Sequence, residues 1–235
     1  QICKDEGDDN FHFEVSTSDV NDSDNIIIYG KEGFGKDKVM DMIQLLMKDD
    51  IVPDYSGWEV VFDSADVKIA NVEVYKELVK TISEDKDFLQ NMDSCFCHPR
   101  EYFKDNADRY DDRGITNRDA IDTFVWVAVA DEMIESGIAI ELDWKEEKDE
   151  FLSSIEELAN ENNLVVDEGM LDDEGDIPSW CKELDDRWMK DGYCVAGIDI
   201  DSDSYVLFVC KTDKLKSLTE LAKSINHRID LAQNM

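Results

Sequence analysis

The sequence predicts an α+β protein of two packed blocks, each a small, mostly antiparallel sheet covered by helices. Two observations support this fold class. Short runs rich in β-branched and aromatic residues are joined by turn-forming residues, and they are interspersed with segments whose apolar residues recur at helical spacing. An irregular, charged stretch at residues 84–114 separates the two blocks. We therefore expect an N-terminal domain at residues 1–100 and a C-terminal domain at residues 115–235.

The N-terminal block is predicted to have the order ββαβα. "FHFEVST" and "NIIIYG" are typical of strands, and "SDVNDSD" between them is typical of a turn. In the helix that follows, Val39, Ile43, Leu46 and Met47 fall on one face. The expected elements are strands at 11–17 and 25–30, a helix at 35–50, a strand at 57–65 and a helix at 72–82.

The C-terminal block is predicted to have the order αβααββα. Three polar residues mark expected helix starts: the capping-box pattern that begins at Thr116, then Ser179, then Thr212. "YCVAGIDI" and "SYVLFVCK" flank "DSD" as a β-hairpin. The expected elements are a helix to about Ser136, a strand at 138–144, helices at 145–162 and 180–191, strands at 193–200 and 204–211, and a final helix.

The charge of the chain is strongly negative, with 58 acidic and 24 basic residues and a net charge of −34. Binding to nucleic acid or to an anionic membrane surface is disfavoured, because both need Lys and Arg to neutralise phosphates. The partner classes that the charge allows are cations, a basic protein or no partner at all. The charge is also explained by solubility alone, since like-charged copies repel one another. The longest apolar run, "FVWVAVA", is much shorter than the ~20 residues of a membrane span.

The cysteine pattern favours a cytoplasmic protein. Cys181, Cys194 and Cys210 lie in apolar or helical contexts, where a reduced thiol acts as a small buried hydrophobe. The spacing of the six cysteines lacks the density of a secreted disulfide scaffold. Because the chain starts at Gln1, removal of an upstream signal segment is kept as an alternative.

The stretch "IIIYGKEGFGKDKVMDM" resembles a phosphate-binding loop in outline. Gly30, Gly35 and Lys36 fit the pattern, but Asp37 stands where a magnesium-binding hydroxyl is required. The preceding strand also pairs most naturally as a hairpin, whereas phosphate loops belong to parallel sheets. We therefore interpret Gly30, Gly33 and Gly35 as positions of positive φ between strand and helix.

Two short segments are candidates for a metal site. Asp199, Asp201 and Asp203 match the first positions of a calcium loop, but the required Gly and bidentate Glu are missing and the flanks are strands. A hairpin turn explains the same residues. "CFCHP" (95–99) brings two thiols and His98 together, but a second zinc-ligand pair is not evident, which favours a loop with free thiols.

An acidic loop at residues 167–176 is a candidate for binding a partner or a cation. More often such a charge run is a solvated loop. We assign no catalytic residue and no cofactor, because no carboxylate pair stands out and no nucleophile motif is present. The tryptophans Trp58, Trp126, Trp144 and Trp180 are expected to be core or half-buried anchors. The acidic candidates are Asp167, Glu168, Asp172, Asp173, Glu174 and Asp176.

Two segments, "AIELDWKEEKDEFLSSIEELA" and "YCVAGIDIDSDSYVLFVCKTDKLKSLTELA", resemble an uncharacterised bacterial family of unknown function, the one numbered 6630. The resemblance covers roughly residues 115–225, and the N-terminal block resembles other uncharacterised bacterial strand-strand-helix-strand domains more weakly. Neither resemblance implies an activity or any site residues.

The leading hypothesis is a soluble, non-enzymatic binding protein of bacterial origin, whose acidic surface meets a basic protein as an immunity protein meets its toxin. The alternative is a divalent-cation-binding protein or metal-dependent enzyme that uses the Asp-rich loops.

Overall fold

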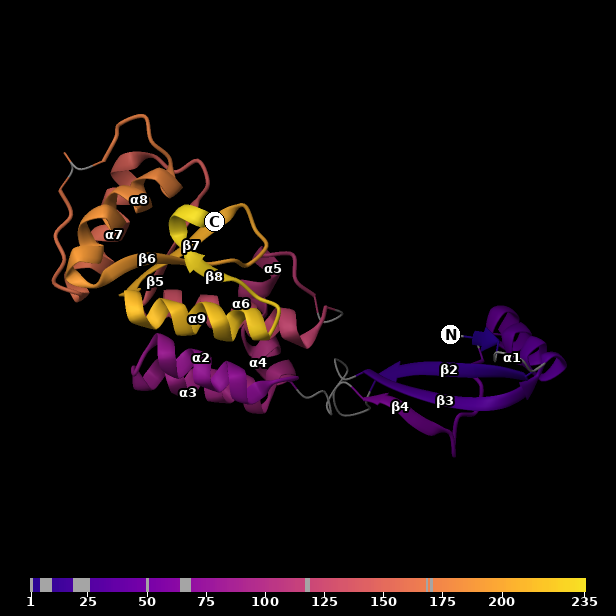
Figure 1. Cartoon of the computed structure of the whole chain (residues 1–235). Helices are drawn as coiled ribbons and strands as arrows, with labels where there is room; N and C mark the ends of the chain where they lie inside the picture. The colour runs from indigo at the N-terminus through magenta and orange to yellow at the C-terminus, as the bar shows by residue number, and fades with distance from the viewer. Residues whose placement is uncertain are drawn as a thin grey trace. The chain divides into compact units, whose positions relative to one another are not determined.

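The computed structural model of the chain describes residues 2–4, 10–18, 26–49, 51–63, 69–116, 119–167, 169 and 171–235. It divides into two compact units, Gln1–Lys68 and Ile69–Met235 (Figure 1). Each unit contains a four-stranded antiparallel sheet together with helices. The α+β fold class is therefore confirmed. No helix in the described ranges is long and apolar enough to cross a membrane.

The division between the units lies earlier than the sequence predicted. We expected it between residues 100 and 115, but the second unit begins at Ile69. The reason is long-range packing: α2 (Val72–Ile82) contacts α9 (Thr212–Ser224), and α3 (Lys86–Cys97) contacts α6 (Ile121–Glu135). Partners so far apart in sequence leave no signal in the local pattern, so the prediction assigned α2 and α3 to the wrong block.

The first unit has the predicted ββαβ order with an additional short strand before it. Its sheet has the order β1-β2-β3-β4, and its small core contains Phe13, Val15, Val39 and Met42. The three-residue strand β1 was not predicted because it is too short to show a pattern. The elements are β1 (Ile2–Lys4), β2 (Asn10–Ser18), β3 (Ile26–Gly35), α1 (Lys36–Asp49) and β4 (Glu59–Asp63).

The glycine-containing part of the stretch that resembles a phosphate loop, residues 30–35, belongs to a strand, and α1 follows it directly. β3 continues to Gly35 and pairs antiparallel with β2, which confirms the predicted hairpin pairing. Our explanation of the glycines holds only for Gly33, whose φ is +82°. Gly30 is needed for space instead, because a Cβ there would lie 2.8 Å from Val61 and 3.1 Å from His12.

The second unit places its sheet, in the order β5-β7-β6-β8, between layers of helices. In Figure 1, α7 and α8 cover one face, α6 and α9 the other, and α2 and α3 form a further layer. The predicted order αβααββα is present, and the short strand β8 was missed. The remaining elements are α4 (Pro99–Asp105), α5 (Ala107–Asp112), β5 (Ala139–Asp143), α7 (Lys148–Glu161), α8 (Ile177–Trp188), η3 (Met189–Asp191), β6 (Tyr193–Ile198), β7 (Ser204–Lys211), β8 (Ile229–Leu231) and η4 (Ala232–Asn234).

The helix starts differ from the predicted caps by a few residues. The Asp119 carboxylate accepts the backbone N–H of Thr116 at 2.8 Å, so this pair closes its own turn, and α6 begins after it. Asp176, not Ser179, is the N-cap of α8, and Ser179 is its reciprocal partner in a capping box. Thr212 is the first residue of α9 rather than its cap.

Candidate functional site

The central helix α6 is buried along most of its length, and it carries two buried acids, Asp131 and Glu132, which are 6% and 2% exposed. Glu132 accepts hydrogen bonds from Asn91 at 2.7 Å, from Arg109 at 2.9 Å and from the Tyr102 hydroxyl. Burial and the Glu132 carboxylate raise the pKa of Tyr102, so the hydroxyl remains a proton donor. These three donors therefore supply the hydrogen bonds that the buried Glu132 carboxylate needs among the helices.

The second buried acid belongs to a network around Arg113, which follows α5. Arg113 donates to Asp131 at 2.6 Å and to the two oxygens of Glu141 on β5 at 3.0 Å and 2.7 Å. Burial raises the pKa of Asp131 despite Arg113, and the other Asp131 oxygen has no hydrogen-bond partner within the described residues. Burial also acts to raise the pKa of Glu141, but hydrogen bonds from Arg113 and Ser204 outweigh it and keep that pKa below its usual value.

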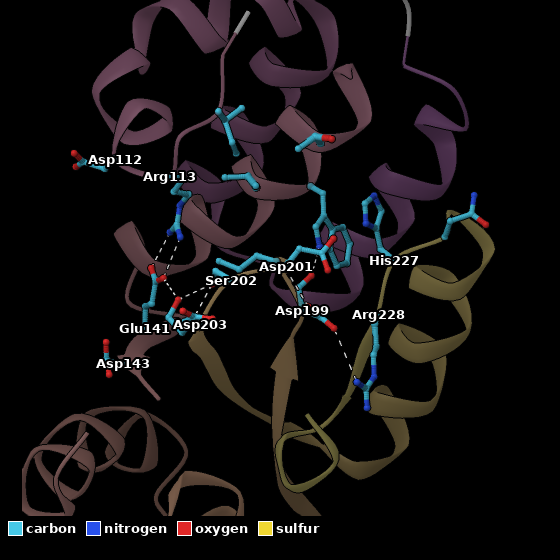
Figure 2. Close-up of a pocket in the computed structure, with 17 residues that line it drawn as sticks. Asp112, Arg113, Glu141, Asp143, Asp199, Asp201, Ser202, Asp203, His227 and Arg228 are labelled. Carbon is cyan, nitrogen blue, oxygen red and sulfur yellow. Dashed lines mark hydrogen bonds and ion pairs between the residues drawn. The ribbon is translucent and has the colours of Figure 1, made fainter. Parts of the chain in front are cut away.

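A hollow of about 700 Å³ opens beside this network (Figure 2). Its border includes Arg113 and Glu141, the turn between β6 and β7, and the segment before β8. Figure 2 shows Arg113 paired with Glu141 on one side and Arg228 directed at Asp199 on the other. The charged side chains that line it are Asp112, Arg113, Glu141, Asp143, Asp199, Asp201, Asp203 and Arg228.

His227 forms a further part of the wall. Its ring stacks on Trp126 with centroids 4.1 Å apart and planes 3° from parallel. Its Nε2 lies 2.8 Å from Asp122, whose other oxygen accepts the Tyr75 hydroxyl at 2.7 Å. Burial lowers the pKa of His227 despite the Asp122 carboxylate, so the imidazole is neutral at neutral pH. This chain of contacts joins α2, α6 and the segment before β8.

The hairpin acids occupy different positions relative to the hollow. Asp199 builds the turn: its carboxylate accepts the Asp201 N–H at 3.1 Å, and its carbonyl accepts the Trp126 indole N–H at 2.6 Å. Asp201, at φ 56°, and Asp203 are exposed. Neither of their carboxylates makes a hydrogen bond or an ion pair within the described residues. The predicted hairpin turn is present.

Neither of the predicted metal candidates forms a ligand set. Across the described ranges, no three His, Cys, Asp or Glu side chains come together to hold a metal ion. In the second candidate, Cys95 is buried while Cys97 and His98 are exposed, so the side chains separate. The two cysteines lie on α3 and not in the expected loop. Both are free thiols, as are Cys181, Cys194 and Cys210, and the last three are buried as predicted.

The acidic candidates of residues 167–176 mostly stabilise their own loop. Asp173 pairs with Lys148 at 2.5 Å, and this contact holds the pKa of Asp173 below its usual value. Asp176 caps α8, and Asp172 and Asp167 each accept a nearby backbone N–H. Glu174 is exposed, and Glu168 lies outside the described residues. None of the described acids of this loop lines the hollow.

Sequence reasoning found the hairpin but missed most of the residues around it. Arg113, Glu141 and His227 come from three segments far apart in the chain, and no motif links them. The one available signal was the position of Asp131 and Glu132 inside an otherwise apolar helical run, since buried acids need cationic or hydrogen-bonding partners. Trp144, expected to be at least half buried, is 53% exposed, because it follows the last residue of β5.

The comparisons with known proteins identify a family. No curated protein and no solved structure gave a match. One family model matches residues 74–232, a longer stretch than the resemblance at residues 115–225 suggested. It begins within α2, in agreement with the assignment of that helix to the second unit. The chain therefore belongs to the family described as Domain of unknown function (DUF6630).

Proposed function

We propose that the protein is a non-enzymatic binding protein, which recognises a basic protein at the hollow beside the β6–β7 hairpin. The observation that carries the proposal is the exposure of three acids on its border, Asp112, Asp201 and Asp203. Within the described residues these carboxylates have no ion-pair partner. Carboxylates that face solvent without a cation favour association with a positively charged surface.

The electrostatics of the hollow support the same partner. Six carboxylates line it, against the two arginines Arg113 and Arg228. Both arginines are engaged, the first by Glu141 and Asp131 and the second by Asp199 and Asp230. A neutral His227 adds no positive charge. A cationic group that enters the hollow therefore meets a net negative field.

A divalent cation on the same hairpin is the second candidate. It has less support, because Asp199 is already held by the Asp201 N–H and lies 3.9 Å from Arg228. Asp201 and Asp203 remain as exposed oxygen donors. Thermal melting with calcium, magnesium or a chelator separates the two candidates, since an ion that binds only the folded protein raises its stability as the ion concentration exceeds the dissociation constant.

The proposal also places the protein in a bacterial cytoplasm. The free thiols of the described cysteines fit a reducing compartment, including Cys194 and Cys210, whose sulfurs lie 3.9 Å apart.

The test of the basic-partner proposal is capture from a lysate with the protein immobilised, at low and at high salt. We expect a basic protein that is retained at low salt and released at high salt, because screening weakens exposed charge pairs. The double variant Asp201→Asn/Asp203→Asn should lose it. The matched control Asp87→Asn/Asp93→Asn removes the same charge from α3 and should keep it. Equal retention by both double variants contradicts the proposal.

A further inference from the structure

A second hollow, of about 470 Å³, shares the β6–β7 hairpin with the first. As in the first hollow, aromatic and apolar residues join the carboxylates in its lining. Trp144, Tyr205 and Met235 line it together with Asp199 and Asp203. Arginine, lysine and histidine are absent from its lining, as far as the described residues show. This mixture of aromatic rings and carboxylates is the chemistry that recognises an organic cation.

The sheet register explains why Trp144 is at this position. β5 pairs antiparallel with β7, and Asp143, the last residue of β5, is opposite Ser204. Trp144 therefore leaves the sheet next to Asp203, which precedes β7. Trp144 is 53% exposed, whereas Trp126 and Trp180 are each 3% exposed. A large, solvent-exposed indole in the lining of a hollow is a feature typical of binding surfaces.

The ring already attracts a cation within its own chain. The Lys145 Nζ lies 4.4 Å from the centroid of the Trp144 ring. That distance is within the ~6 Å over which the negative face of an indole attracts an ammonium group. Lys145 is itself exposed, so an external cation can compete with it for the ring.

We propose that this second hollow is the subsite that takes one lysine or arginine side chain of the basic partner. The Trp144 ring contacts the cationic head, the Asp203 carboxylate neutralises it, and Tyr205 and Met235 contact its aliphatic stem. The inference rests on the proposed function and specifies which chemical group of the partner is bound. Lys145 acts as an internal competitor, which the partner's side chain displaces from the ring.

The test uses the whole protein and three capped tripeptides, Gly-Lys-Gly, Gly-Arg-Gly and Gly-norleucine-Gly. Nitrogen-15 labelling makes the indole signals visible by NMR, and Trp144→Phe identifies the signal of Trp144. We expect saturable shifts of that signal with the lysine or the arginine peptide and none with the uncharged norleucine peptide. Equal shifts with norleucine, or no saturable shift of Trp144 with either cationic peptide, overturn the proposal.

Variants test the contribution of each residue, with affinities followed on backbone signals of the β6–β7 hairpin. Trp144→Leu should weaken the binding of the cationic peptides at least about fivefold. Trp144→Phe keeps an aromatic face and should therefore retain part of the affinity. Asp203→Asn should weaken binding about threefold, and the remote control Asp93→Asn should not. Lys145→Gln should tighten binding about threefold, because it removes the competitor. Unchanged affinity in both Trp144→Leu and Lys145→Gln contradicts the subsite.

The same variants separate this inference from the proposed function. If Trp144→Leu still captures the basic partner from the lysate with full retention, the subsite is wrong and the basic-partner proposal stands. If the wild-type protein captures no basic partner, the proposed function is wrong. The peptide titration then shows whether the cation subsite exists without a protein partner.

Discussion

Asp185 supplies a pH-dependent contribution to stability that can be calculated from its surroundings. It lies on α8 and is 1% exposed. One oxygen accepts the Val195 N–H of β6 at 2.8 Å, and the other accepts the Gln233 amide at 3.3 Å. Burial raises its pKa to about 6 from the usual 3.8, and the hydrogen bond from Val195 offsets only part of that effect.

The sign of the pH dependence follows from the raised pKa. The folded protein holds the Asp185 proton more tightly than the unfolded chain, so this contribution to stability is present in full below about pH 3.8 and is lost as the pH rises through about 6. A difference of about two pH units corresponds to about 3 kcal/mol. Above about pH 6 the free energy of unfolding is therefore lower by about 3 kcal/mol than it would be with the proton held.

Asp185→Asn removes the charge and keeps the shape. The Asn oxygen can still accept the Val195 N–H, and the Gln233 amide can rotate to accept the Asn NH₂ group. The pKa of about 6 already includes the hydrogen bond from Val195, so the variant should be more stable by up to about 3 kcal/mol at about pH 7. The advantage should disappear at about pH 4, where the wild-type residue is protonated.

Urea unfolding followed by tryptophan fluorescence measures this difference, since four of the five tryptophans lie in the second unit. The difference between variant and wild type is the informative quantity, because the carboxylates that do not interact with Asp185 titrate equally in both. Asp186→Asn is the matched control: it changes the same charge on the exposed side of α8 and should shift stability by less than about 0.5 kcal/mol. An Asp185→Asn difference that stays constant from about pH 4 to about pH 7 refutes the reasoning.

Three further substitutions are checked by the same unfolding measurement. Arg113→Met should cost about 3–5 kcal/mol, because it leaves two carboxylates without their cation. Arg228→Met should cost less than about 1 kcal/mol, because its ion pairs of 3.7–3.9 Å and its hydrogen bond to the Asn234 carbonyl lie at the surface. Glu132→Leu should cost about 3 kcal/mol, because it removes the buried acceptor of three hydrogen bonds. Gly30→Ala should destabilise the first unit by about 1–3 kcal/mol, while Gly35→Ala, with free space around it, should be close to neutral. If Arg228→Met loses more stability than Arg113→Met, or Gly35→Ala more than Gly30→Ala, the structural reason given for that pair is contradicted.

Much of the fold could be predicted from local patterns. The α+β class, the β2–β3 hairpin and the β6–β7 hairpin follow from segments that carry strand residues and turn residues side by side. The strands β1 and β8 were missed, because three residues show no periodicity and form only by pairing with a neighbour. The unit boundary was wrong for a related reason: α2 belongs to the second unit through its contacts with α9, more than a hundred residues away.

The site was predictable only in part. The acids of the hairpin stand together in the sequence, so they were found, and so was the turn that they form. The arginine network was not, because Arg113, Asp131 and Glu141 come from a loop, a helix and a strand that only the tertiary fold brings together. Trp144 was misjudged for the opposite reason. It follows an apolar strand, but the strand ends one residue earlier and the indole turns toward solvent.

The placement of basic residues explains how so acidic a chain keeps both a fold and a surface charge. Arg109 and Arg113 neutralise buried carboxylates, a task for which the planar guanidinium is suited because it binds two oxygens at once. The carboxylates of Asp201 and Asp203 face solvent instead. Loss of an inner partner therefore acts on stability, whereas neutralisation of an outer carboxylate leaves the core untouched. Because of this division, a binding defect in Asp201→Asn/Asp203→Asn can be attributed to the surface rather than to unfolding.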